Sequence, residues 1–422
     1  MFNPDPVINK INFDKVLELK TDRDFIDNEI FFNALTKPVN SFKIESIGPQ
    51  KKITIVLSDN TRKIPLTEMI DAVLNTIGNH KATNIRFLIA TGTHKPSDPK
   101  TLGISPHILD KYSFFNHNSK DYTQLSYVGQ VSPKTAFFSS PIDNDFLRPY
   151  YEVARDADRH VFTEAYMSSP EKIFINKLIT EADLVILIGK IKPHYFSGYS
   201  GGAKNLVPGC TGRHFILRNH FYKIHPSASL ASINNNLVRT ELEEAAMLCG
   251  NHIFNYNVIM GKDDQTLGCV AGHIIDSHRL GVKLYYDNFK VTSHAKYDVI
   301  LATDSWPVNM SLKQFKKVAS SSCRVVKENG VIILYGKCAE GLGSDSRLND
   351  KIYLSHLNAI KPKGVDIFVY SSISQTDIEL AGFYNYIPSI ETGLEYAKNK
   401  IGQNMSICHI PHGSLIIPEI KE

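Results

Sequence analysis

The sequence predicts an α/β protein of two α/β domains, with a cofactor- and substrate-binding cleft between them. Short runs rich in Val, Ile and Leu alternate with stretches of helical character, and buried parallel strands have this continuous apolar composition. The alternation implies crossover connections and therefore α/β layering. Several of the apolar runs also end in loops rich in glycine or histidine, at the sheet edge where α/β proteins bind ligands.

The expected elements follow one another along the chain. The strand-like "KITIVLSD" and "NIRFLIATG" flank the helical "LTEMIDAVLNTIG", and "ADLVILIG" precedes a long glycine-rich block. Further on, "YDVILATD", "GVIILYG" and "VDIFVYSS" are strand-like, and "LKQFKKVASSS" is helical. A polar stretch near 288–297 places the domain boundary at about residue 285, giving domains 1–285 and 286–422. The tail "MSICHIPHGSLIIPEI" could be a strand of either domain.

Composition limits the classes of function. The 422 residues carry a net charge of +4 with both signs mixed along the chain, which predicts neither a nucleic-acid nor a membrane partner. The start, "MFNPDPVINKINFDK", lacks the apolar run of a secretory signal, so a cytoplasmic protein is expected. Six cysteines without a CxxC pattern indicate reduced thiols, so a metal would have to bind through histidine. The sequence leaves the oligomeric state open.

Two loops after strand-like runs carry candidate side chains. In "SDNTRKIP", Asp59 and Arg62 could form a simple turn with an exposed guanidinium. Alternatively, Arg62 binds a carboxylate or phosphate with its planar donors while Asp59 orients a neighbour. In "ATGTHKP", His94 is either a surface turn residue or a general acid/base, because imidazole titrates near neutral pH.

The block "KPHYFSGYSGGAKNLVPG", residues 192–209, is harder to explain as plain structure. Gly198, Gly201 and Gly202 surround Ser200, and glycine permits positive φ and close approach of a ligand to backbone N–H groups. The block is not a Walker A loop, because the residues on either side of its lysine do not fit that pattern. Lys204 could pair with phosphate, cap a helix or act as a nucleophilic amine.

Two predicted helices carry further candidates. His220, in "RNH", is either structural or a metal ligand. Gln314 and Lys317 are three residues apart and so share a helix face. The neighbouring Lys313 and Lys316 favour the interpretation of that helix as an exposed surface.

Together these motifs resemble the lactate racemase family, whose members use a nickel-pincer nucleotide cofactor. The resemblance runs through most of the chain, and the glycine- and lysine-rich block is its most specific part. The motifs, in the family's order, are "DNTRKIP", "ATGTHKP", "KPHYFSGYSGGAKNLVPG", the histidine of "RNH", "GCVAGHIIDSHRLGV", "WPVNMSLKQFKK" and "GVIILYGKCAEGLGSD".

The resemblance implies how the cofactor is held. Lys204 matches the lysine that joins the cofactor covalently through a thioamide, and His220 matches the protein ligand to nickel. The pincer's own sulfurs and carbon would supply the other in-plane donors of a square-planar centre. The remaining residues expected at the cofactor are Gly198, Ser200, Gly201, Gly202 and Asp59.

The resemblance also implies the reaction. His94 and His194 match two acid/base histidines on opposite sides of a 2-hydroxy acid substrate. One removes the hydroxyl proton while hydride leaves the α-carbon for the cofactor, and a transient 2-oxo acid is reduced again on either face. The positions that hold the substrate carboxylate match Arg62, Gln314 and Lys317.

One residue departs from the family pattern. Lactate-specific members tend to carry an aromatic residue directly before the glutamine, where this chain has Lys313. We therefore expect a substrate with a larger or acidic side chain in place of lactate. The cofactor must be made by other proteins, which makes cofactor-synthesis enzymes the expected partners.

Two other functions compete with the racemase. In the first, histidines such as His94, His194 and His220 bind zinc or iron directly for hydrolysis. In the second, the chain binds a nucleotide without catalysis. Metal bound without an adduct on Lys204 would favour the first, and unchanged properties on removal of His94 and His194 would favour the second.

Overall fold

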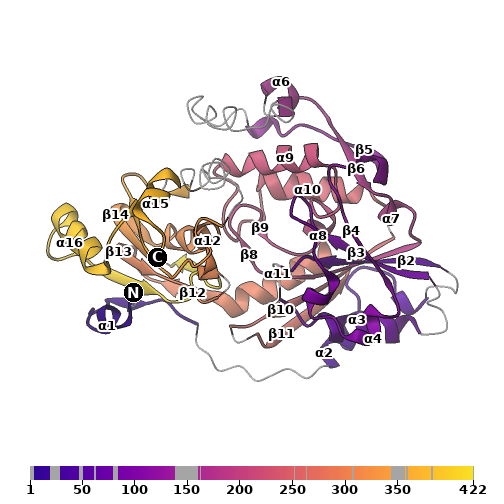
Figure 1. Ribbon diagram of the computed structural model, residues 1–422, viewed down its shortest axis with the longest axis horizontal. Coiled ribbons are helices and arrows are strands. Elements are labelled where there is room, and N and C mark those ends of the chain that lie inside the picture. The colour runs from indigo at the N-terminus through magenta and orange to yellow at the C-terminus, as the bar shows by residue number, and fades with distance from the viewer. Residues whose placement is uncertain are drawn as a thin grey trace.

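The computed structural model describes residues 4–19, 29–46, 51–60, 63–78, 84–137, 160–161, 163–250, 252–262, 264–306, 308–343, 357, 360–381 and 384–421. Two six-stranded sheets with helices packed against them organise this part of the chain (Figure 1). The α/β class predicted from the sequence is confirmed.

The first sheet has the strand order β11-β10-β7-β2-β3-β4, and all its pairs are parallel except β10 with β11. The chain runs outward from β2 through β3 to β4, then returns to place β7 on the other side of β2. The connections therefore reverse direction between β2 and β7. Its strands are β2 (Lys52–Ser58), β3 (Asn84–Ala90), β4 (Ser113–Asn116), β7 (Leu184–Lys190), β10 (Ile253–Met260) and β11 (Thr266–Gly272).

Both faces of this sheet are covered, which explains the continuous apolar strands. Successive residues of a strand point to opposite faces. Val185 and Leu187 of β7 join one core cluster with α8 (Ala203–Leu206), α9 (Arg213–Phe221) and α10 (Leu237–Met247). Ile186 and Ile188 join the opposite cluster with α2 (Glu29–Thr36) and α3 (Leu66–Ile77). α11 (Asp276–Phe289) packs against β10 and β11.

The second sheet is parallel throughout, in the order β1-β17-β13-β14-β15-β16. α12 (Leu312–Ser322) covers one face and α16 (Ile390–Ile401) covers the other. Here too the connections reverse direction, between β13 and β17. The strands are β1 (Lys15–Val16), β13 (Tyr297–Ala302), β14 (Val326–Tyr335), β15 (Asp366–Tyr370), β16 (Asn385–Tyr386) and β17 (Ile407–Ile410).

The chain passes from one sheet to the other through α11 and β12 (Lys290–Ser293), close to the boundary expected at about 285. The C-terminal segment belongs to the second sheet, because β17 pairs with β13. β18 (Ile417–Ile420) pairs with β12. β1, from the start of the chain, pairs with β17. The division into 1–285 and 286–422 stays a prediction, with β1 as a strand that the first segment contributes to the second sheet.

The remaining described α-helices and strands are short. They are α1 (Asp5–Ile8), α4 (Pro106–Leu109), β5 (Leu125–Val131), α6 (Glu164–Met167), β6 (Glu171–Asn176), α7 (Lys177–Thr180), β8 (Pro193–His194), β9 (Gly198–Tyr199) and α15 (Gln375–Ala381).

In the described part of the chain, no helix is both long and apolar enough to cross a bilayer. All six cysteines are free thiols.

Candidate functional site

Three of the predicted site residues follow the carboxyl ends of adjacent parallel strands. Asp59 comes directly after β2, His94 follows β3, and His194 follows β7. Loops at the point where the connections of a parallel sheet reverse direction form the crevice in which such sheets bind ligands. Asp59 and His194 lie on the two sides of that point, so the topology itself gathers these residues at one edge of the sheet.

Asp59 and His94 contact each other directly. The Nδ1 of His94 lies 2.5 Å from Oδ2 of Asp59, close enough for a strong hydrogen bond. The carboxylate is buried, with 7% of its side chain exposed, while the imidazole is 63% exposed. A carboxylate that accepts from Nδ1–H fixes the tautomer and makes Nε2 the basic nitrogen. This pair can therefore remove a proton from a group that approaches Nε2.

His194 packs against the aromatic rings of its own hairpin. It lies on the hairpin of β8 and β9, and its ring stacks on Tyr195 with centroids 4.8 Å apart and an interplanar angle of 18°. Phe196 contacts it edge-on at 4.5 Å. The backbone N–H of Ser197 donates to Nδ1 at 3.3 Å, so Nδ1 faces the hairpin backbone.

The glycines of the block are required by the packing of the protein itself. Gly198, Gly201 and Gly202 have φ values of +73°, +77° and +58°. A Cβ on Gly201 would collide with the side chain of Asn257, and one on Gly202 would lie 2.7 Å from the ring of His278. Asn257 and His278 thus occupy the space that side chains at positions 201 and 202 would need. Contact of these glycines with a nucleotide stays a prediction.

Ser200 is held by hydrogen bonds through both its hydroxyl and its backbone carbonyl. Its hydroxyl donates to the carbonyl of Lys190 at 2.7 Å, and Nε2 of His278 donates to the carbonyl of Ser200 at 3.0 Å. Burial, with the charges of Arg239 and Arg279, holds the pKa of His278 well below its ordinary value. A neutral imidazole suits this position, because its Nδ1 accepts from Arg279 at 3.2 Å.

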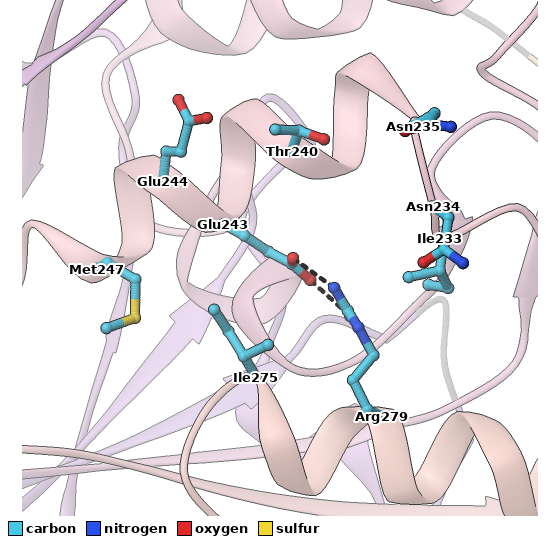
Figure 2. A pocket seen from close by; sticks show the side chains of 9 residues that line it. All are labelled: Ile233, Asn234, Asn235, Thr240, Glu243, Glu244, Met247, Ile275 and Arg279. Atoms are coloured by element: carbon cyan, nitrogen blue, oxygen red, sulfur yellow. Dashed lines mark hydrogen bonds and ion pairs between the residues drawn. The ribbon is translucent and has the colours of Figure 1, made fainter.

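Arg279, which contacts His278, also lines a surface hollow. Figure 2 shows Glu243 and Arg279 among its lining residues, joined by two hydrogen bonds, which are 2.6 and 2.8 Å long. The hollow has a volume of about 370 Å³ and is also lined by Asn235, Thr240 and Ile275. Its lining includes none of the predicted site residues. It belongs to the structure that holds the glycine loop, and we assign it no chemistry.

Lys204 and His220 both contact the aromatic ring of Phe196. The Nζ of Lys204 is 4.9 Å from the centroid of Phe196, and the ring of His220 meets Phe196 edge-on at 5.1 Å. Lys204 is only 8% exposed, although it lies in the first turn of α8. The structure thus brings together the two residues that the sequence assigns to the cofactor.

His220 has the properties of a metal ligand. Its Nδ1–H donates to the carbonyl of Ile216 at 2.8 Å, one turn earlier in α9, so Nε2 is the nitrogen suited to bind a metal. Burial lowers the pKa of His220 well below its ordinary value, and the charges of Lys204 and Lys223 lower it further. The imidazole is therefore neutral at pH 7, as coordination requires. Within the described residues, no group of three or more His, Cys, Asp and Glu side chains is arranged to hold a metal ion.

α12 brings the second sheet to this site. Lys317 donates to the side-chain carbonyl of Gln314 at 2.6 Å, so these two residues share a face as predicted. The prediction that Lys316 belongs to an exposed surface is wrong: it is 3% exposed, and its Nζ lies 2.7 Å from the hydroxyl of Tyr195. The reason is that α12 packs against the β8–β9 hairpin (Figure 1), which the lysine pattern could not reveal. Arg62 lies outside the residues that the structure describes.

Sequence reasoning missed three side chains at this site. Tyr195 and Phe196 contact His194, and Phe196 also contacts His220 and Lys204. The only signal for these two rings was their place directly after His194 in the specific block. Lys223 follows His220 by three residues, about one helical turn, and is 4% exposed. Nothing in its local sequence marks it as buried.

Lys223 gives a prediction on stability. Burial, together with the charge of Lys313, lowers its pKa from 10.5 to about 7. The folded state then binds fewer protons than the unfolded state between about pH 7 and pH 10.5, so stability should rise with pH across that range. We expect Lys223→Met to stabilise the protein by an amount on the order of a few kcal/mol at pH 7, and by almost nothing near pH 10.5. Urea unfolding at both pH values measures this, and an equal gain at both would contradict the burial of a charged lysine.

The comparison with known families matches residues 7–139 and 151–231 to the lactate racemase N-terminal domain. Two curated relatives are lactate racemases. One, from Thermoanaerobacterium thermosaccharolyticum, is 26% identical over 326 residues, which cover 76% of this chain and 68% of the relative. The other, from Lactiplantibacillus plantarum, is 25% identical over 328 residues with the same two coverages.

Two solved structures share the fold. The lactate racemase apoprotein from T. thermosaccharolyticum superposes with a TM-score of 0.80 at 21% identity, covering 96% of this chain and 95% of the other. A crystal structure of a protein from Thermotoga maritima superposes with a TM-score of 0.65 at 15% identity, covering 95% of this chain and all of the other.

Proposed function

This chain belongs to the lactate racemase family, and on that premise we propose that it inverts the α-carbon of a 2-hydroxy acid. Two relatives that are lactate racemases support an isomerase of the racemase or epimerase type. The observation that carries the proposal is the pairing of His94 with a buried Asp59 at one strand end, beside a second histidine at the neighbouring loop. Racemisation needs two proton-transfer groups, because each enantiomer presents its hydroxyl to a different one.

We further propose that the cofactor is a nickel-pincer nucleotide. Lys204 would hold it covalently, and Nε2 of His220 would be the protein's ligand to nickel. The fit rests on their surroundings: a buried amine and a neutral imidazole both contact the ring of Phe196, and Nδ1 of the imidazole already donates to a backbone carbonyl. When bound, the cofactor would supply reversible acceptance of hydride from the α-carbon.

The chain's own residues then perform the proton transfer and the orientation. Nε2 of His94, made basic by Asp59, takes the hydroxyl proton of one enantiomer, and His194 takes that of the other. Gln314 and Lys317, already in contact on α12, would hold the substrate carboxylate, with Arg62 as a third group. The carboxyl ends of the strands in the first sheet and in the second sheet would then face one cleft between the two sheets.

Lys313 bears on which substrate this is. It lies next to Gln314 on α12, and its charge helps to lower the pKa of Lys223. The charge of Lys223 in turn helps to lower the pKa of His220. Two lysines near the substrate position would favour an acidic side chain over the methyl group of lactate. We propose a 2-hydroxy acid with a larger or acidic side chain, such as malate.

The test is a comparison of racemisation of lactate and malate by the protein produced together with cofactor-synthesis enzymes. We expect turnover of malate to exceed that of lactate, and Lys313→Tyr to move the ratio toward lactate by about tenfold or more. An unchanged ratio would remove Lys313 from the specificity argument. If neither acid nor any other 2-hydroxy acid were racemised by a protein that carries the cofactor, the racemase proposal would be wrong.

A further inference from the structure

We infer that Lys316 is a positioning residue for His194 and acts on it through the ring of Tyr195. This contact would tie the second sheet to the acid/base site of the first. The inference rests on the proposed function for the role of His194, while the contact itself is a property of the protein without cofactor or substrate.

The first link joins α12 to the β8–β9 hairpin. The Nζ of Lys316 donates to the hydroxyl of Tyr195 at 2.7 Å and lies 3.9 Å from the centroid of its ring. Both side chains are buried, with 3% and 6% exposed. Burying an ammonium group costs free energy unless it has such partners, and a cation over an aromatic face contributes more when it is desolvated. The lysine and the tyrosine therefore hold each other in place.

The second link joins Tyr195 to His194. Their rings are nearly parallel at 4.8 Å, and Phe196 meets both edge-on, at 4.5 Å from His194 and 4.7 Å from Tyr195. The hydrogen bonds to Nδ1 of His194, from backbone N–H groups at 3.3 and 3.5 Å, are long. The ring stack, together with these hydrogen bonds, thus holds the plane of this imidazole.

The two histidines are therefore oriented in different ways. His94 is oriented by a carboxylate within its own sheet, at 2.5 Å. His194 is oriented by rings whose outer member is held from α12, which also carries Gln314 and Lys317. A substrate that binds through those two residues would act on the same helix that aligns His194. We expect correct docking of α12 to be a condition for proton transfer at His194.

The direct test is NMR of the apoprotein labelled at histidine Cε1, with the signals of His194 and His94 assigned from single replacements of each. We expect Lys316→Met to shift the His194 signal and to leave the His94 signal in place. Lys327→Met is the control, since this lysine forms an exposed ion pair with Asp298 on the second sheet. If Lys316→Met does not fold, Tyr195→Phe removes only the hydroxyl acceptor and keeps the ring. An unmoved His194 signal in the folded variant would overturn the inference.

Kinetics of the cofactor-loaded enzyme separates positioning from general damage. We expect Lys316→Met to lower kcat by about 100-fold with little change in KM, because a misplacement of about 1 Å at a reacting group has that effect. Lys316→Arg, which keeps the cation, should restore most of the rate, and Lys317→Ala should act mainly on KM. Full turnover by Lys316→Met would contradict the inference. A shifted His194 signal in a protein that racemises nothing would instead leave the contact in place and refute the proposed function.

Discussion

Replacement of Lys204 by alanine should abolish retention of the nickel-pincer nucleotide. The wild-type chain, produced with the cofactor-synthesis enzymes, should carry an adduct on the peptide that contains Lys204 and about one nickel per chain. The variant should carry neither, because the covalent link is lost and His220 alone is a single ligand. Intact mass, peptide mapping and metal analysis measure this result directly.

Lys204→Arg is the matched control. It keeps a buried cation near Phe196 but has no primary amine, so it should fold as the wild type does and still lack the adduct. An adduct on either variant would show that the covalent assignment is wrong. Metal bound without any adduct on the wild type would favour direct binding by histidines, and hence a metal-dependent hydrolase.

Replacement of His94 by alanine should lower racemisation by about 10²- to 10⁴-fold, the usual contribution of a positioned acid/base group. The adduct and the nickel content should be unchanged, because His94 is absent from the contacts proposed to hold the cofactor. Folding should also be unaffected, since the side chain is 63% exposed. Asp59→Asn should reduce turnover as well, because an amide no longer favours the tautomer with a basic Nε2.

The chain offers a close control for this prediction. His107 also contacts a carboxylate, that of Asp71, with Nε2 and Oδ1 3.1 Å apart, and its side chain is 64% exposed. It lies on α4, outside the proposed catalytic loops. His107→Ala should keep full turnover. If His94→Ala behaved in the same way, His94 would not be the base, and a binding protein without catalysis would become the better interpretation.

The sequence by itself determined the fold class and predicted the residues of the candidate site. Continuous apolar runs such as "ADLVILIG" are needed wherever a strand is buried on both faces, so the parallel sheets could be predicted from local composition. Glycine at 201 and 202 was recognisable for a similar reason, because positive φ leaves few other residues possible. The alternation of strands and helices also predicted that ligand-binding loops would gather at the carboxyl ends of strands.

Only the tertiary structure decided which of these pieces meet. The placement of β7 beside β2 brings the loops of Asp59 and His194 together, and the pairing of β1 with β17 joins the two ends of the chain. Lys316 is the clearest case, because its lysine-rich helix resembles an exposed surface and yet packs against Tyr195. Local sequence fixes backbone preference and periodicity. Burial is decided by what another part of the chain places against a side chain, and that information is long-range.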